Sequence, residues 1–307
     1  MSGRMKPTRR ALAAAGIGAA VVLVTVGTTL TLAPATGSAS AGKPSAQYLA
    51  SARSALVRYL QHNDAPASHA RIPGSEGGFG TLRPINNAGS FNWSGYVDTD
   101  ATAGYFKSVS GDWTTPSVTA SCTHEDTVAA QWIGLDGWSN TTVEQEGVID
   151  WCFEDHATYY TWYEMYPAGS VAVGNALQPG DKIATSITTS VAKGLTSYKL
   201  VLTDSTHTTN SFSKTLTCPA ATCKDTSAEW IDERPDFSTS GYAPLADFGT
   251  WSLSGASVKG GTVAGTAINS YTNSPIQMFD STGSYHLATA GALTGGRGFT
   301  VTWVDSY

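Results

Sequence analysis

The sequence predicts an all-β fold, an antiparallel β-sandwich or jelly roll, for the part of the chain that follows residue 90. Three observations support this. Short runs rich in Val, Ile, Thr, Tyr and Trp alternate with turn residues, helical periodicity is missing after residue 91, and charged residues make up only 14% of the chain. The roughly 216 residues involved are enough for one sizeable hydrophobic core and few for two. We therefore expect a single β-domain over residues 91–307.

The strand-like runs set the expected order of elements in this domain. Each is short, and many hydroxyl side chains suit strands with one solvated face. The runs are FNWSGYVD (91–98), YFKSVSGDWT (105–114), KIATSITTSV (182–191), SYKLVLTDS (197–205), HTTNSFSKTLT (207–217), GTAINSYTN (265–273) and GFTVTWVD (298–305).

Residues 1–41 have the pattern of a signal peptide. Arg4, Lys6, Arg9 and Arg10 precede an apolar run over residues 11–32, and Ala39-Ser40-Ala41 offers a small-x-small cleavage site. The apolar run is also long enough to span a bilayer, so a retained N-terminal anchor is the alternative. We expect export, a secreted extracellular product, and no stable membrane association after signal cleavage.

Residues 42–90 are predicted to be a pro-segment with a linker. Over residues 45–62, apolar side chains recur at the spacing of one amphipathic helix, and a stretch rich in Gly, Pro, Ser and Ala follows it. Residues 1–91 contain nine Lys and Arg against two Asp and Glu, whereas residues 92–307 contain nine against 22. A basic helix on a flexible linker can dock on an acidic domain by Coulomb attraction. An ordinary solvated extension is the alternative.

The four cysteines, Cys122, Cys152, Cys218 and Cys223, all lie in the exported part of the chain, where disulfides form. Three pairings are possible. The close spacing of Cys218 and Cys223 favours a bond that clips one loop, which leaves Cys122 with Cys152. A zinc site is disfavoured because no cysteine pair has two-residue spacing.

One stretch concentrates the groups that could act on a substrate. Residues 129–167 contain Trp132, Trp138, Trp151 and Trp162 among Gln131, Gln145, Glu164 and several acidic pairs. Aromatic faces beside amides and carboxyls suit a groove for a polymeric substrate, although buried strands would also explain part of the pattern. The chain lacks a G-x-S-x-G elbow, an HExxH pair and a P-loop, so the chemistry narrows to carboxyls and amides.

Five ordered motifs indicate a family. NWSGYV (92–97), QWIGLDG (131–137), VEQEGV (143–148), TWYEMYP (161–167) and SAEWIDERP (227–235) resemble the glutamic peptidases, or eqolisins, which are secreted acid endopeptidases. The resemblance implies a concanavalin-like sandwich of two antiparallel sheets. It also places the catalytic Gln on Gln145, the catalytic Glu on Glu233, and supporting residues on Trp132, Asp136 and Glu164. We add Trp93 and Trp162 as expected substrate-binding rings.

The chain departs from the family pattern around the expected catalytic Gln. Glu144 and Glu146 flank Gln145 where relatives have Leu and Thr or Ser, and Tyr160 replaces an Asp. One residue is also inserted between Gly147 and Asp150. These changes leave both expected catalytic residues in place and bear on substrate preference and pH optimum.

The expected chemistry also follows from the residue types. Peptide hydrolysis needs a base for water, an acid for the leaving amine and a donor for the oxyanion. Glu233 can serve as base and then as acid, while the Gln145 amide donates at any pH. If residues 143–147 form a strand, Val143, Gln145 and Gly147 share one face, and Glu144 and Glu146 point to the other.

Two other functions fit part of the pattern. A sandwich glycoside hydrolase would use two carboxylates and aromatic rings, and a carbohydrate-binding module would need only the rings. Gln145 discriminates, because a glycosidase needs a second carboxylate in its place. The preferred interpretation is a monomeric peptidase acting on protein or peptide substrates, without metal, cofactor or nucleic acid.

Overall fold

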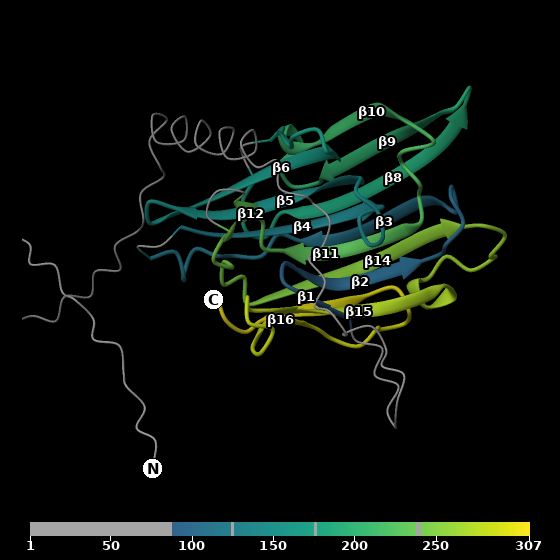
Figure 1. Ribbon diagram of the computed structural model, residues 1–307. Coiled ribbons are helices and arrows are strands. Elements are labelled where there is room, and N and C mark those ends of the chain that lie inside the picture. The colour runs from purple at the N-terminus through teal and green to yellow at the C-terminus, as the bar shows by residue number, and fades with distance from the viewer. Residues whose placement is uncertain (1–87, 124–125, 175–176, 238–240) are drawn as a thin grey trace, which may run out of the picture. The chain divides into compact units, whose positions relative to one another are not determined.

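A computed structural model describes residues 88–123, 126–174, 177–237 and 241–307 (Figure 1). The predicted signal peptide, the predicted helix over residues 45–62 and nearly all of the predicted linker lie outside these ranges. In the ranges that are described, no helix is long and apolar enough to cross a membrane.

The described residues form strands and two short 3-10 turns. The strands are β1 (Ala88–Ser90), β2 (Trp93–Thr99), β3 (Phe106–Thr114), β4 (Thr127–Leu135), β5 (Val143–Phe153), β6 (His156–Tyr166), β7 (Val171–Ala172), β8 (Lys182–Ala192), β9 (Leu195–Asp204), β10 (Phe212–Pro219), β11 (Ser227–Glu233), β12 (Asp236–Phe237), β13 (Gly241–Tyr242), β14 (Thr250–Gly260), β15 (Thr272–Phe279), β16 (His286–Ala290) and β17 (Phe299–Trp303). The 3-10 turns are η1 (Thr208–Asn210) and η2 (Ile268–Ser270).

Hydrogen bonds link 15 of these strands into one continuous order. It runs β10-β9-β8-β3-β14-β17-β16-β15-β2-β11-β4-β5-β6-β7, and β1 adds to β15. Among the strand pairs of the described residues, β1–β15 alone is parallel, and β12 and β13 form a separate two-stranded ribbon. The all-β, mainly antiparallel fold expected from the sequence is therefore confirmed.

The continuous order folds into two layers. In Figure 1, β4, β5 and β11 overlap with β3, β8 and β9, and contacts join β11 to β3 and β14, β3 and β8 to β4, and β5 to β9. The antiparallel pairing of β16 with β17 connects the layers. The family resemblance implied a sandwich of two sheets; here the two layers are joined through this pair, because β16 bonds to a strand of each layer.

Strand alternation separates two apolar clusters. Between the layers lies a large core that includes Phe106, Leu200, Trp230 and Trp251. A second cluster, which includes Trp132, occupies the other face of β2, β11, β4, β5 and β6. Each fully buried large apolar side chain contributes roughly 1.5–3 kcal/mol. We call this second face the dyad face, because it carries Gln145 and Glu233, the pair (dyad) of expected catalytic residues.

Two predicted runs begin differently from expectation. The runs at 207–217 and 265–273 start in η1 and η2, and their strands begin at Phe212 and Thr272. In the first run, the side chain of Asn210 donates to Asp204 and its N–H bonds to the His207 carbonyl, which competes with a strand ladder. In the second run, the backbone N–H groups of Ser270 and Tyr271 bond to the carbonyls of Ala267 and Ile268.

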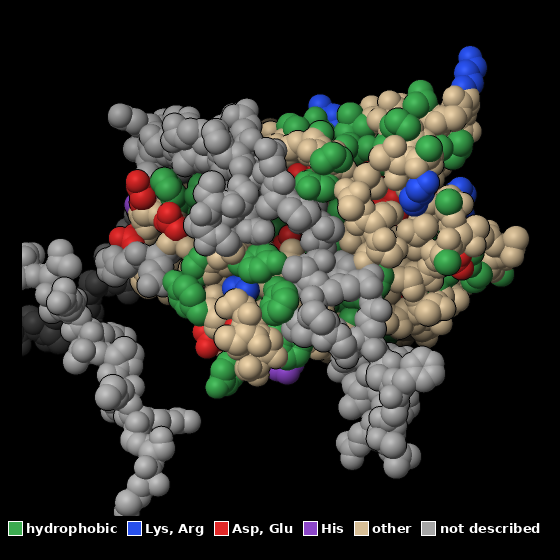
Figure 2. Space-filling view, viewed as in Figure 1, with side chains coloured by type: hydrophobic (Ala, Val, Ile, Leu, Met, Phe, Trp, Pro, Cys, Tyr) green, Lys and Arg blue, Asp and Glu red, His purple; other side chains and the backbone are tan. Residues whose placement is uncertain are grey.

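The structure contains disulfides Cys122–Cys152 and Cys218–Cys223, the pairing favoured from the spacing of the cysteines. The first joins the turn before β4 to β5. Neutral polar side chains and backbone dominate the visible surface outside the grey region, with few Lys or Arg atoms (Figure 2). Exposed Ser252 and Ser254 alternating with buried Trp251 and Leu253 on β14 show how hydroxyl residues form such a surface.

Candidate active site

Glu233 ends β11 with both carboxyl oxygens engaged. Its Oε2 accepts a hydrogen bond of 2.8 Å from Trp132 Nε1, and its Oε1 accepts one of 3.2 Å from Asn92 Nδ2. The side chain is buried, and β11 lies between β2 and β4, which position Asn92 and Trp132 on either side of it. Two donors on one carboxyl favour its anion.

Burial outweighs these donors in the electrostatics of Glu233. Removal from water raises its pKa to about 8, with the charge of Glu164 acting in the same direction, while the indoles of Trp132 and Trp93 and the amide of Asn92 lower it. In this buried state Glu233 is a neutral acid at acidic pH. Glu233 can act as a base at acidic pH only when contact with water removes the effect of burial and lowers its pKa.

Gln145 and Glu164 are direct cross-strand partners on β5 and β6. Gln145 Nε2 donates to Glu164 Oε2 at 2.5 Å, and Ser170 Oγ donates to Glu164 Oε1 at 2.7 Å. Gln145 Oε1 has no hydrogen-bond partner among the described residues. Burial raises the pKa of Glu164 to about 7, and the bonds from Ser170 and Gln145 oppose that rise.

Two glycines, Gly134 and Gly147, make room for the indole of Trp132 between Gln145 and Glu233. Gly147 is paired with Trp132, and a Cβ on it would lie 2.1 Å from the Gln131 carbonyl oxygen and 2.7 Å from the Trp132 Cα. A Cβ on Gly134 would lie 2.8 Å from the Trp132 ring and 3.4 Å from Gln145 Cβ. The indole can therefore lie along β4, with Gln145 at one end and Glu233 at the other.

The register separates the backbones of the two expected catalytic residues. Gln145 is opposite Gly134, which pairs with Glu229, whereas Glu233 is four positions further along β11. Their side chains share the dyad face, and Glu164, bonded to Gln145, is near enough to Glu233 for its charge to raise the pKa of that group. The structure thus brings Glu233, Trp132, Glu164 and Gln145 into one site.

Asp136 has a different environment. It has a left-handed backbone, φ 69°, and its carboxylate accepts bonds from the backbone N–H groups of Lys224 (2.7 Å), Asp225 (2.9 Å) and Thr226 (2.9 Å) and from Asn140 Nδ2 (2.6 Å). It therefore ties the loop before β11 to the loop before β5. No hydrogen bond joins it to Glu233, Gln145 or Glu164 among the described residues. Asp136 therefore supports the site by stabilising the loop that leads into β11.

The expected substrate-binding rings are buried. Trp93 and Trp132 are 0% exposed and meet edge to face with their centroids 4.8 Å apart, and Trp162 is 5% exposed. Gln145 is also only 1% exposed, so its amide and the three rings are shielded from solvent.

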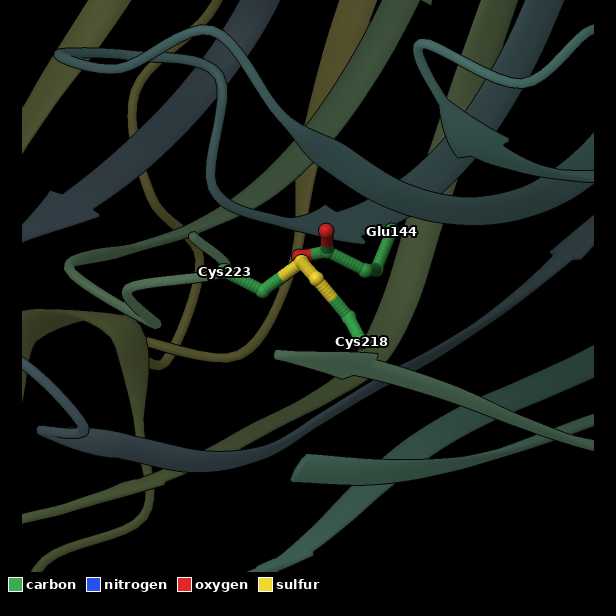
Figure 3. Close-up of side chains that lie close together, drawn as sticks. All are labelled: Glu144, Cys218 and Cys223. Atoms are coloured by element: carbon green, nitrogen blue, oxygen red, sulfur yellow. A yellow bond between two sulfur atoms is a disulfide. The ribbon is translucent and has the colours of Figure 1, made fainter. Parts of the chain in front are cut away.

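Glu144 and Glu146 point away from this face, as the alternation predicted. Glu144 lies beside the Cys218–Cys223 disulfide (Figure 3), and Glu146 accepts a 3.0 Å bond from the Ser186 N–H. Burial raises the pKa of both well above the usual range. The sulfurs beside Glu144 are bonded to each other, so they offer no thiolate to a metal. Glu233 and Glu164 belong to none of the metal-ligand groupings formed by the described side chains.

Sequence reasoning missed two residues of the site, Asn92 and Ser170. Asn92 is the first residue of the NWSGYV motif, but nothing in the sequence links it to Glu233. Its partner Glu233 is 141 positions away. Ser170 follows β6 in a loop and has no sequence signal, because its role depends on where the loop returns to β6.

Comparisons with known proteins give the family context. Residues 91–303 match the model of the Peptidase A4 family. The chain is 31% identical over 217 residues to aspergillopepsin-2 of Aspergillus niger, covering 63% of this chain and 74% of that protein. The crystal structure of aspergilloglutamic peptidase from the same organism is 25% identical, covers 58% of this chain and 99% of that one, and aligns with a TM-score of 0.46.

Proposed function

Because the chain belongs to the peptidase A4 family, the glutamic-type endopeptidases, we propose that Gln145 and Glu233 are the pair with which it hydrolyses peptide bonds in acid. One observation carries the proposal. A carboxyl held through both oxygens by Trp132 and Asn92 shares the dyad face with an amide held by Glu164 whose own oxygen has no described partner.

The first step is attack by water. Glu233 as the anion takes a proton from water, and the water oxygen bonds to the carbonyl carbon of the scissile peptide. Gln145 Oε1 is available to accept the other water hydrogen, and the Nε2–H that Glu164 does not use is available for the developing oxyanion.

The second step returns the same proton. Glu233, now neutral, gives it to the peptide nitrogen, the C–N bond breaks, and the products are a carboxylic acid and an amine. Trp132 and Asn92 keep the Glu233 carboxyl in one orientation through both steps. Glu164 does the same for the Gln145 amide.

The buried state would oppose this reaction in acid. With a pKa of about 8, Glu233 is protonated there and cannot accept a proton from water. Opening the dyad face to water removes the largest cause of the shift and produces the base. The opening that admits substrate would thus also allow Glu233 to ionise.

Removal of residues before β1 is the proposed route to that opening. Of the predicted pro-segment and linker, residues 42–90, we assign the part before β1 as the pro-segment released outside the cell, and its net positive charge suits docking on an acidic domain. Ser90 Oγ donates to Asn92 Oδ1 at 3.1 Å, and Asn92 holds Glu233, so β1 should be retained. Maturation should therefore cut between residues 72 and 87, and N-terminal sequencing of acid-treated protein reports the position.

Digestion of denatured casein tests the function. The secreted protein should release peptides at about pH 4 with pepstatin present to suppress aspartic peptidases, and Gln145→Ala should reduce the rate by about 10²–10³. A glycoside hydrolase would instead cleave a glycan and tolerate the Gln145 change. An acid-matured protein that leaves casein intact would reject the proposal.

A further inference from the structure

Glu164 has a different partner on each of its two oxygens. Gln145 Nε2 donates to Oε2 at 2.5 Å, and Ser170 Oγ contacts Oε1 at 2.7 Å. Ser170 is half-buried and directly precedes β7, which pairs back onto β6 at Trp162 and Tyr163. The short β7 pairing therefore holds the Ser170 hydroxyl against Glu164.

A hydroxyl can serve Glu164 in either protonation state. When Glu164 is an anion, Ser170 donates to Oε1. When Glu164 is neutral, a proton on Oε1 can be donated to Ser170 Oγ, and Oε2 remains an acceptor for the Gln145 amide. With Ser170 present, Nε2 of Gln145 therefore faces Glu164 in both states.

Without that hydroxyl the neutral acid has another choice. Its proton can move to Oε2 and be donated to Gln145 Oε1, which requires the amide to rotate by half a turn. In the rotated amide, Gln145 Oε1 accepts this hydrogen bond, whereas in the structure it has no partner among the described residues. An anionic Glu164 cannot hold the rotated amide, because a carboxylate only accepts hydrogen bonds.

We propose that Ser170 is a positioning residue that acts through Glu164 to fix which end of the Gln145 amide is left free for the reaction. The inference rests on the proposed function, in which Oε1 of Gln145 holds the attacking water. Ser170 touches neither substrate nor water in this scheme. Its contribution is to choose the oxygen of Glu164 that carries the proton.

The pH at which the choice matters follows from Glu164. In the closed state burial raises its pKa to about 7, which makes it neutral in acid, and opening the dyad face to water lowers that pKa, so the range in which Glu164 is neutral ends at or below about pH 7. The charge of Glu164 also acts on Glu233 in the same site. The orienting role of Ser170 should be strongest at acidic pH. It should weaken as Glu164 ionises.

Kinetics of Ser170→Ala and Ser170→Thr at about pH 4 test the inference. We expect kcat of Ser170→Ala to fall at least about tenfold, as for loss of about one hydrogen bond, with little change in KM. Ser170→Thr keeps the hydroxyl and should recover most of the loss. Ser205→Ala, an exposed serine on the connection after β9, is the matched control and should be unaffected.

The pH profile separates orientation from general damage. The ratio of wild-type to Ser170→Ala kcat should shrink as pH rises toward about 7. A constant ratio, or a folded Ser170→Ala protein with wild-type kcat at acidic pH, would overturn the inference.

A second variant covers the case in which Ser170→Ala does not fold. Glu164→Gln imitates the neutral acid, offering an oxygen to Gln145 and an N–H to Ser170, so the side-chain amide signal of Gln145 in NMR spectra should lie close to its wild-type position at acidic pH. A Gln145 amide signal that is displaced from the wild-type position in folded Glu164→Gln protein at acidic pH would contradict the proposed proton placement.

An NMR readout keeps the inference separate from the proposed function. The side-chain amide signal of Gln145, assigned by its loss in Gln145→Ala, should move in Ser170→Ala and stay in place in Ser170→Thr at acidic pH. If the wild type cleaves no peptide, the proposed function fails while this signal still tests orientation. If the wild type is active and the signal does not move, only the inference fails.

Discussion

Trp132 is the residue on which the chemistry of Glu233 most depends. Its indole Nε1 donates at 2.8 Å to Glu233 Oε2 and is the leading influence that lowers the pKa of that carboxyl. The ring is also fully buried between Gln145 and Glu233, so it both spaces the pair and tunes one member of it. Its function is electrostatic as much as steric.

Replacing Trp132 by Phe separates these two functions. Phe keeps an aromatic ring and removes the N–H, so the anion of Glu233 loses its shorter hydrogen bond and its pKa rises. The acidic limb of kcat/KM, which follows ionisation of the base, should move to higher pH, by about one unit if the bond is worth about 1.4 kcal/mol. Trp138→Phe, on the same face, is the control. An unmoved limb in folded Trp132→Phe protein would show that the contact does not tune Glu233.

At the scale of elements, the close approach of β4 and β5 is what brings the site together. Gly147 has no room for a side chain, because a Cβ would be 2.1 Å from a backbone oxygen on β4. Asp136 provides a second constraint by accepting three backbone N–H groups of the loop that leads into β11. The two strands with Gln145 and Glu233 are thus fixed to β4 independently.

Gly147→Ala should separate β4 from β5. The backbone there cannot yield without breaking ladder bonds, so we expect a loss of at least about 2 kcal/mol in the free energy of unfolding, measured by urea denaturation in acid. Gly194→Ala, in a hairpin turn with nothing within 4 Å of the added Cβ, should cost only the strain of its positive φ, about 1 kcal/mol. Equal losses in the two variants would contradict the packing described for β5.

Sequence patterns predicted those elements whose signal is local. The alternation that placed Glu144 and Glu146 opposite Gln145 was right, because a strand buried on both faces keeps a period of two residues. The starts of β10 and β15 were missed, because 3-10 turns precede both strands, one with side-chain contacts of Asn210 and the other with backbone bonds of Ser270 and Tyr271. Asn92 and Ser170 could not be identified, because their partners meet them only through strand pairing.

At the scale of the whole molecule, the described strands bury many carboxyls that make no ion pair with a described Lys or Arg. Asp98, Glu144, Glu229 and Asp232 are fully buried and each has at least one carboxylate oxygen without a described hydrogen-bond partner. Burial raises the pKa of Asp98 to about 9 and that of the other three well above the usual range. Burial in the folded state therefore favours the protonated form of each of these groups.

The stability of the protein should accordingly be greatest in acid. A carboxyl whose folded pKa lies above its unfolded value binds more protons in the folded state, so its stabilisation is complete below about pH 4 and is lost as pH rises toward the folded pKa, about 9 for Asp98. Each such group removes up to about 1.4 kcal/mol per pH unit in that interval.

Urea denaturation at a series of pH values measures this dependence. The slope of unfolding free energy against pH should be negative above about pH 4 and should become shallower in Asp98→Asn, which is permanently neutral. Glu154→Gln, at an exposed turn, should leave the slope unchanged. A protein that gained stability between acidic and neutral pH would refute the description of these carboxyls as buried acids.

The identity of Glu233 as the group that moves the proton is tested most directly by the acid-matured Glu233→Gln protein. Gln preserves the shape of the side chain and removes the only proposed acceptor for the proton of water. We expect cleavage of a defined peptide, followed by mass spectrometry at about pH 4, to fall to background while the peptide still binds. Near-normal hydrolysis by correctly folded Glu233→Gln protein would remove Glu233 from the mechanism.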